Sequence, residues 1–116
     1  MLIASIVSHV EAASYSKTAY GYYEAAGCKY RTQETARYYD SGTIRWSYSN
    51  HSGVLVSWAC LGAVYASPYD YDSWVDGSTQ VMRRATKVTI TDYNYVNHTG
   101  NAIRTYKFNT STNTFE

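Results

Sequence analysis

The chain has 116 residues, enough for one domain with a modest core but not for two. Its ten basic and nine acidic residues nearly balance, so it lacks the strong positive field of nucleic-acid-binding proteins. No segment is apolar for long enough to cross a bilayer as a helix. The composition therefore argues against a nucleic-acid partner and against a transmembrane protein.

Residues 1–12 resemble the end of a secretion signal. A short apolar run over residues 2–7 precedes Val10-Glu11-Ala12, which offers small residues at the two positions that a signal peptidase recognises. The alternative is a short amphipathic helix, because the apolar residues also fit a helical stripe. We predict a truncated signal remnant over 1–12, a single β domain over 13–116, and a secreted or extracellular protein.

The composition beyond the first residues is typical of strands. The sequence contains 14 tyrosines, three tryptophans and one proline, and it is rich in threonine; tyrosine, tryptophan and threonine favour β structure. Two strands are expected at Ser16–Tyr23 and Cys28–Gln33, on either side of Ala25-Ala26-Gly27. Alternation along the second strand directs one set of side chains into the core. That set is Tyr30, Thr32 and Ala36.

Two copies of the pattern Tyr-x-Asn-His-Ser/Thr-Gly, at residues 48–53 and 95–100, lie between alternating runs. Three-residue hairpin loops commonly end with a glycine in the left-handed conformation. The pattern therefore predicts two tight turns, and Asp40-Ser41-Gly42 predicts a third. The expected turn glycines are Gly42, Gly53 and Gly100.

These turns would fix the strand registers. The turn at Gly53 would place Trp46 opposite Trp58 and collect the apolar side chains on one face. The turn at Gly100 would place Tyr95 opposite Ile103, and the turn at Gly42 would place Ala36 opposite Trp46. In this arrangement His51 and His98 lie at hairpin tips, without the further ligands that a metal site requires.

Cys28 and Cys60 are the only cysteines. Their number and spacing do not suit zinc, which needs four ligands. In an exported protein an even cysteine count predicts one disulfide, which would close a loop of about thirty residues and stabilise the fold by about 3–4 kcal/mol. The alternative is a pair of buried, reduced thiols.

The second half of the chain completes the predicted fold. Residues 61–86 hold the proline and most of the aspartates and are expected to be mostly irregular, with a long strand starting within Val81–Thr86 and running to Val96. The polar residues 109–114 are expected to form a frayed last strand. The sequence predicts an all-β fold, a small antiparallel β-sandwich or twisted barrel of about six to eight short strands with tight hairpins.

The segment Ser67–Gly77 reads SPYDYDSWVDG and is the most suggestive candidate site. Flat aromatic rings can stack on the C–H faces of sugars while neighbouring carboxylates accept hydroxyl protons, and tyrosine and tryptophan also anchor protein interfaces. Alternate aspartates are calcium-type ligands, although the EF-hand spacing is absent. The predicted binding residues are Tyr69, Tyr71, Trp74, Asp70, Asp72 and Asp76. No cofactor is expected apart from calcium as an alternative.

The sequence contains no nucleophile elbow and no Cys/His signature. We therefore assign no catalytic residue and no metal site. The enzymatic alternative left open is a glycosidase-type carboxylate pair drawn from Glu24, Glu34 or the aspartates of residues 67–77.

The function predicted is a non-catalytic binding module, secreted or surface-associated, that engages a glycan or a protein surface through exposed tyrosine and tryptophan. The alternative is a bacteriocin-like or toxin-like β-protein acting on a competitor's cell envelope. The composition, with its many Tyr, Ser and Thr residues and one possible cystine, resembles small secreted proteins of Gram-positive bacteria in general character rather than in any motif.

Overall fold

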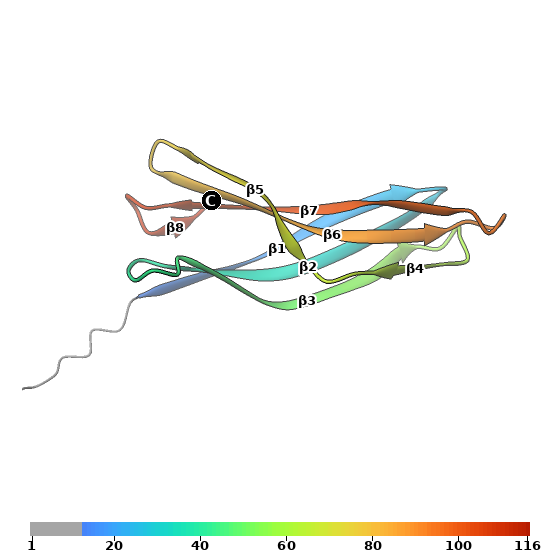
Figure 1. Ribbon diagram of the computed structural model, residues 1–116, viewed down its shortest axis with the longest axis horizontal. Helices are drawn as coiled ribbons and strands as arrows, with labels where there is room; N and C mark the ends of the chain where they lie inside the picture. Colours follow the sequence, from blue (N-terminus) through green and yellow to red (C-terminus); the bar gives the residue numbers. More distant parts are fainter. Residues whose placement is uncertain (1–12) are drawn as a thin grey trace, which may run out of the picture.

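A computed structural model describes residues 13–116 and shows two antiparallel sheets facing one another (Figure 1). The first sheet has the order β1-β2-β3, with strands β1 (Ser14–Ala25), β2 (Cys28–Tyr39) and β3 (Trp46–Ser57). The second contains β4 (Gly62–Tyr65), β5 (Tyr69–Asp76), β6 (Thr79–Thr91), β7 (Asn97–Asn109) and β8 (Thr114–Phe115). The predicted all-β fold is confirmed, with eight strands. The predicted signal remnant at 1–12 lies outside the described residues.

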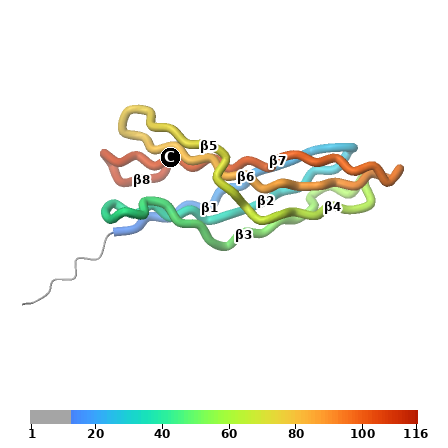
Figure 2. The backbone as a smooth tube through the Cα atoms, viewed as in Figure 1, coloured from blue at the N-terminus to red at the C-terminus, as the bar shows by residue number. Residues whose placement is uncertain are grey.

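β6 is the central strand of the second sheet. Its residues 79–85 pair with β5 and its residues 88–91 pair with β4, so these two strands share one side of β6. β7 pairs along the whole other side of β6, and β8 adds a short pair to the end of β7. Figure 2 shows the chain crossing from β4 to β5 along this sheet.

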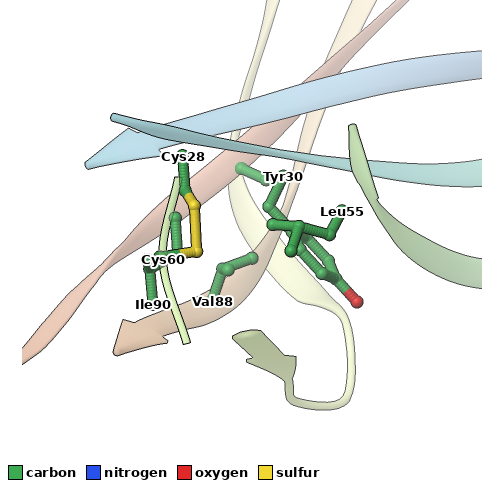
Figure 3. Close-up of a cluster of buried hydrophobic side chains, with 7 residues drawn as sticks. Cys28, Tyr30, Leu55, Cys60, Val88 and Ile90 are labelled. Carbon is green, nitrogen blue, oxygen red and sulfur yellow. A yellow bond between two sulfur atoms is a disulfide. The ribbon is translucent and has the colours of Figure 1, made fainter. Parts of the chain in front are cut away.

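Alternation along β2 creates the inner face of the first sheet. Tyr30, Thr32 and Ala36 are 5%, 0% and 0% exposed, which confirms the three predicted inward positions. Tyr30 joins an apolar cluster at one end of the sandwich (Figure 3). The cluster consists of Cys28, Tyr30, Leu55, Cys60, Val88, Ile90 and Ala102.

The predicted disulfide is confirmed. Cys28 opens β2 and Cys60 lies in the β3–β4 loop, with 5.9 Å between their Cα atoms, within the usual range for a disulfide. Both residues are buried. The bond therefore ties the loop after β3 to the start of β2 at the apolar end of the core (Figure 3).

Aromatic rings fill the opposite end of the core. Tyr38 stacks on Phe108 with 4.2 Å between ring centroids, and Trp46 meets the Tyr38 ring edge-on at 5.1 Å. Tyr15 and Phe115 also contact Phe108. Tyrosine therefore supplies core volume that aliphatic side chains supply in most small domains.

The turns predicted at Gly53 and Gly100 are wrong. Gly53 lies inside β3 opposite Thr32, and Gly100 lies inside β7 opposite Val88. Neither glycine has a positive φ. The reason for glycine is close packing: a Cβ at Gly53 would lie 2.6 Å from the Tyr30 ring.

Gly100 makes room in the same way for the ring of Tyr23. The positive φ of each repeat falls elsewhere, at Asn50 in a β-bulge of β3 and at Tyr95 in the β6–β7 turn. That turn spans residues 92–96, so Ile90 pairs with His98. The register predicted from Tyr95 opposite Ile103 is therefore wrong.

The turn glycine predicted at Gly42 is confirmed, because Gly42 has φ +96° in the β2–β3 connection. The connection is longer than three residues, so the predicted register is shifted by two: Ala36 pairs with Tyr48 and Tyr38 pairs with Trp46. This shift brings Trp46 into the aromatic end of the core. The tight β1–β2 turn at Ala26-Gly27, where φ is +51° and +80°, agrees with the prediction for 25–27.

Residues 61–86 are mostly strand rather than irregular, since they include β4, β5 and the start of β6. The long predicted strand exists as β6, but it ends at Thr91 instead of Val96. The predicted site at residues 67–77 therefore lies on a strand, β5, and not on a loop.

Candidate functional site

β5 brings the three predicted aromatic residues to one surface. Tyr69 pairs with Ala85 and Trp74 pairs with Val81 on β6. Tyr69 and Trp74 are five residues apart, so a regular strand would direct them to opposite faces. A bulge between Asp70 and Asp72 inserts one residue and restores a common face. That face is the outer surface of the second sheet.

Arg83 on β6 is the centre of this surface. Its guanidinium lies 5.2 Å from the ring centroids of both Tyr71 and Trp74, within the range of a cation–π contact. Asp72 accepts hydrogen bonds from Nε (2.6 Å) and from Nη2 of the same guanidinium. We refer to Tyr69, Tyr71, Trp74 and Arg83 as the aromatic cluster.

Tyr69 extends the aromatic cluster across β6 to β7. Its hydroxyl donates a 2.6 Å hydrogen bond to Oδ1 of Asn101, and the tyrosine covers Ala85, which is fully buried although it faces outward. Tyr69, Tyr71 and Trp74 nevertheless remain 39%, 44% and 45% exposed. The three rings are thus held by contacts with β6 and β7 and are still partly exposed to solvent.

The predicted acidic residues do not converge. Asp70 pairs with Arg84 at 2.8 Å, whereas Asp72 pairs with Arg83. The hydrogen bond from Arg83 holds the pKa of Asp72 below its ordinary value, and Asp76 lies at the end of β5 opposite Thr79. Within residues 13–116 no group of three or more His, Cys, Asp or Glu side chains could hold a metal ion.

A second polar assembly lies between the sheets. Glu34 of β2 is 1% exposed and accepts two hydrogen bonds from Arg84, at 3.0 and 2.9 Å. Arg104 of β7 is fully buried and donates to the same carboxylate at 3.3 Å. Burial opposes the charge on Arg84, but its hydrogen bonds to Glu34 and Asp70 raise its pKa. Two arginines thus share one buried carboxylate between the sheets, and the exposed Asp70 supplies a second negative charge to Arg84.

Hydroxyl groups complete this buried network. Arg104 Nη1 donates to Thr32 at 2.7 Å and to Thr86 at 2.9 Å. Burial raises the pKa of Tyr106 to about 12, so its hydroxyl stays protonated and donates to the Glu34 carbonyl at 2.7 Å. The network joins β2 of the first sheet to β6 and β7 of the second. It also encloses Glu34, one of the carboxylates named in the glycosidase-type alternative.

His51 borders the buried network instead of a hairpin tip. Its Nε2 lies 2.7 Å from Oγ1 of Thr86. Burial, followed by the charge of Arg104, lowers the pKa of His51 below its ordinary value of 6.5. A neutral imidazole can accept the Thr86 hydroxyl proton, whereas a protonated one would add a positive charge beside two arginines.

We expect His51 to make folding stability depend on pH. Below about pH 6.5 the unfolded chain takes up a proton at His51 that the folded chain does not, so the free energy of unfolding falls as the pH falls from 6.5 to the lowered folded pKa. Urea unfolding at a series of pH values from about one unit above to about one and a half units below 6.5 checks this.

The variant His51→Gln should lose this pH dependence. The control is His98→Gln, which should keep it, because His98 pairs with Asp92 and lies on the other sheet. An equal slope in wild type and His51→Gln would contradict the assignment.

Sequence reasoning missed both arginine partners. Arg83 and Arg84 are adjacent on β6, so one points to the outer surface and the other into the core. The strand predicted to begin within Val81–Thr86 already implied that the two arginines face opposite sides. It could not show their acidic partners, because these lie on other strands.

Residues 13–116 form no helix that could cross a membrane. Comparison with family models, curated proteins and solved structures gave no match. The site must therefore be interpreted from its own geometry.

Proposed function

We propose that the protein is a secreted, non-catalytic binding module that binds a glycan through the aromatic cluster. The observation that carries this proposal is that the Tyr71 and Trp74 rings both lie 5.2 Å from the guanidinium of Arg83, which pairs with Asp72, while the two residues remain 44% and 45% exposed. Secretion is supported by the disulfide, since such bonds persist in oxidising compartments.

A glycan fits this surface better than a protein does. Sugars combine apolar C–H faces with hydroxyl groups, and the cluster combines ring faces with charged hydrogen-bonding groups. Arg83 uses Nε and Nη2 for Asp72, which leaves Nη1 for a ligand hydroxyl. A hollow of about 270 Å³ borders Trp74, and its lining is mostly apolar, with Trp46, Val75 and Met82 among the lining residues. Its polar lining comes from Arg45, Ser73 and Gln80.

The pairing of Asp70 and Asp72 with arginines supports binding without a cation. A carboxylate that is already neutralised is a poor calcium ligand, because calcium needs several free oxygens. The proposed module therefore needs no cofactor.

The test is retention of the protein on immobilised cell-wall glycans and on a panel of purified polysaccharides, with EDTA and with calcium. We expect retention that EDTA does not change. Trp74→Ala should weaken the binding about tenfold or more, because it removes a stacking surface worth over 1.4 kcal/mol. Tyr20→Ala is the matched control, since Tyr20 is 50% exposed on the first sheet.

Retention that Trp74→Ala and Tyr20→Ala reduce equally would contradict the assignment to the aromatic cluster. Loss of retention in EDTA would contradict cofactor-free binding. Failure of the wild type to bind any glycan would overturn the proposed ligand class.

A further inference from the structure

Three connections meet at the disulfide end of the sandwich, far from the C-terminus (Figure 1). They are the β1–β2 turn at residues 26–27, the β3–β4 loop at 58–61 and the β6–β7 turn at 92–96. The Tyr93 hydroxyl lies 3.4 Å from the carbonyl of Trp58, so the second and third connections touch. They present five large apolar or aromatic residues, which we call the apolar tip. These are Trp58, Leu61, Tyr93, Tyr95 and Val96.

The apolar tip is unusually open to solvent. Tyr95 and Trp58 are 80% and 73% exposed, the two highest values for large apolar side chains in residues 13–116. Contiguous exposed apolar surface on a small protein generally marks a contact with a partner or a membrane. Because the residues lie on protruding turns, the tip is better suited to inserting into another surface than to enclosing a small ligand.

Four of the five backbone N–H groups of the β6–β7 turn are hydrogen-bonded within the turn. Asp92 N–H donates to the Val96 carbonyl at 3.0 Å, and Tyr95 N–H donates to the Asp92 carbonyl at 3.0 Å. The Asp92 carboxylate accepts the N–H groups of Asn94 at 2.8 Å and Val96 at 3.0 Å. Unpaired backbone groups are what make a loop costly to transfer into lipid, and the bonded N–H groups reduce this cost for the turn.

The charges beside the apolar tip are paired. The second oxygen of Asp92 lies 2.9 Å from Nε2 of His98, and Lys29 pairs with Glu24 at 3.4 Å next to the β1–β2 turn. The β3–β4 loop itself contains no ionisable side chain other than the bridged Cys60. When His98 is neutral, its pair with Asp92 keeps the negative charge of Asp92, so the ionisable side chains beside the apolar tip have no excess of positive charge.

Tyr95 adopts a backbone conformation that disfavours tyrosine. Its φ is +62°, a region in which glycine and asparagine are favoured and a bulky residue is strained. Neither core packing nor turn geometry explains a tyrosine that is 80% exposed. Strain retained at a surface position points to a function for the side chain itself.

We propose that the apolar tip inserts into the interface of a lipid membrane and holds the module at the membrane surface. Tyrosine and tryptophan favour this interface because one end of each ring is apolar and the other forms hydrogen bonds. A protein partner would supply donors and acceptors to the loops, and would not require a turn with its own N–H groups already bonded. A tip with no excess of positive charge beside it further points to zwitterionic lipid, without dependence on anionic headgroups.

The test is flotation of the whole protein with phosphatidylcholine vesicles, and with vesicles that also contain phosphatidylserine. We expect comparable binding to both, with little change on adding salt, because charge attraction is not the driving force. Trp58→Ser should reduce the bound fraction about tenfold, since a large buried apolar surface is lost.

Tyr95→Asn separates folding from binding. Asparagine tolerates the left-handed conformation, so the melting temperature of this variant should be unchanged or higher while vesicle binding falls. The matched control is Tyr20→Ser, which should bind vesicles as the wild type does. Tyr20 is an exposed tyrosine on the outer face of the first sheet. Trp74→Ala should also float normally, which separates the apolar tip from the glycan site.

Absence of wild-type binding to both vesicle types would overturn the proposal, as would equal binding by Trp58→Ser and the wild type. A wild-type dimer that Trp58→Ser abolishes, without flotation of either protein, would assign the apolar tip to a second copy of the chain instead.

Discussion

Replacing Glu34 with glutamine is expected to lower the free energy of unfolding by about 3–5 kcal/mol, because it removes one partner of a buried ionic network and leaves the other charges behind. Arg104 is fully buried and would lose the negative charge of Glu34, its ion-pair partner, while it keeps the uncharged hydroxyls of Thr32 and Thr86. Arg84 would keep Asp70 but lose a two-point contact with a buried carboxylate.

Urea unfolding measures this effect, and Asp72→Asn is the matched control. Both variants replace a carboxylate bonded to an arginine through Nε and Nη2, but Asp72 lies on the outer surface, where water can replace the lost partner. We expect Glu34→Gln to be far more destabilising. Similar midpoints for the two variants would show that the buried network contributes no more than a surface ion pair.

The buried network centred on Glu34 divides the core into two parts. The apolar cluster around the disulfide and the aromatic end around Phe108 are separated by the network centred on Glu34. A buried ionic group contributes little net stability compared with well-packed apolar residues, but any shifted arrangement of the sheets would leave its charges unpaired. We infer that the network selects one alignment of the two sheets.

Local alternation was sufficient to predict the first hairpin. Tyr30, Thr32 and Ala36 face the core as expected, and the Ala26-Gly27 turn lies where predicted. These features depend on residues close in the sequence, where a period of two and a tight turn determine the geometry. The all-β class followed from the same reasoning.

The repeated Tyr-x-Asn-His-Ser/Thr-Gly pattern misled for a physical reason. A three-residue loop at Gly53 would satisfy the alternation of the flanking residues, so nothing local argues against it. The actual requirement is set by Tyr30, more than twenty residues earlier in the chain, whose ring needs the space above Gly53. Long-range packing of this kind leaves no periodic signal in the sequence.

The candidate site was predictable in its residue types but not in its geometry. The aromatic residues of β5 were identified, yet their shared face depends on the bulge between Asp70 and Asp72. The carboxylates looked available for calcium because Arg83 and Arg84 had no assigned partners. Pairing between β5 and β6 determines both the shared face of the aromatic residues and the partners of the carboxylates. The prediction that residues 61–86 are mostly irregular did not include this pairing.

Reducing the Cys28–Cys60 disulfide is expected to lower the free energy of unfolding by about 3–4 kcal/mol. The bond closes a segment with a sequence separation of 32 residues, and the loop-entropy model assigns a cost of that size to releasing such a segment in the unfolded chain. Urea unfolding with and without a thiol reductant measures the difference, with thiol alkylation and mass spectrometry reporting the redox state.

The double variant Cys28→Ala/Cys60→Ala separates loss of the bond from side effects of the reductant. It should match the reduced wild type and should not respond to reductant. Because Cys60 lies between Trp58 and Leu61 in the β3–β4 loop, the same variant should also loosen the apolar tip and weaken vesicle binding. Two alkylatable thiols in the native, unreduced protein would contradict the disulfide, and with it the argument for an oxidising compartment.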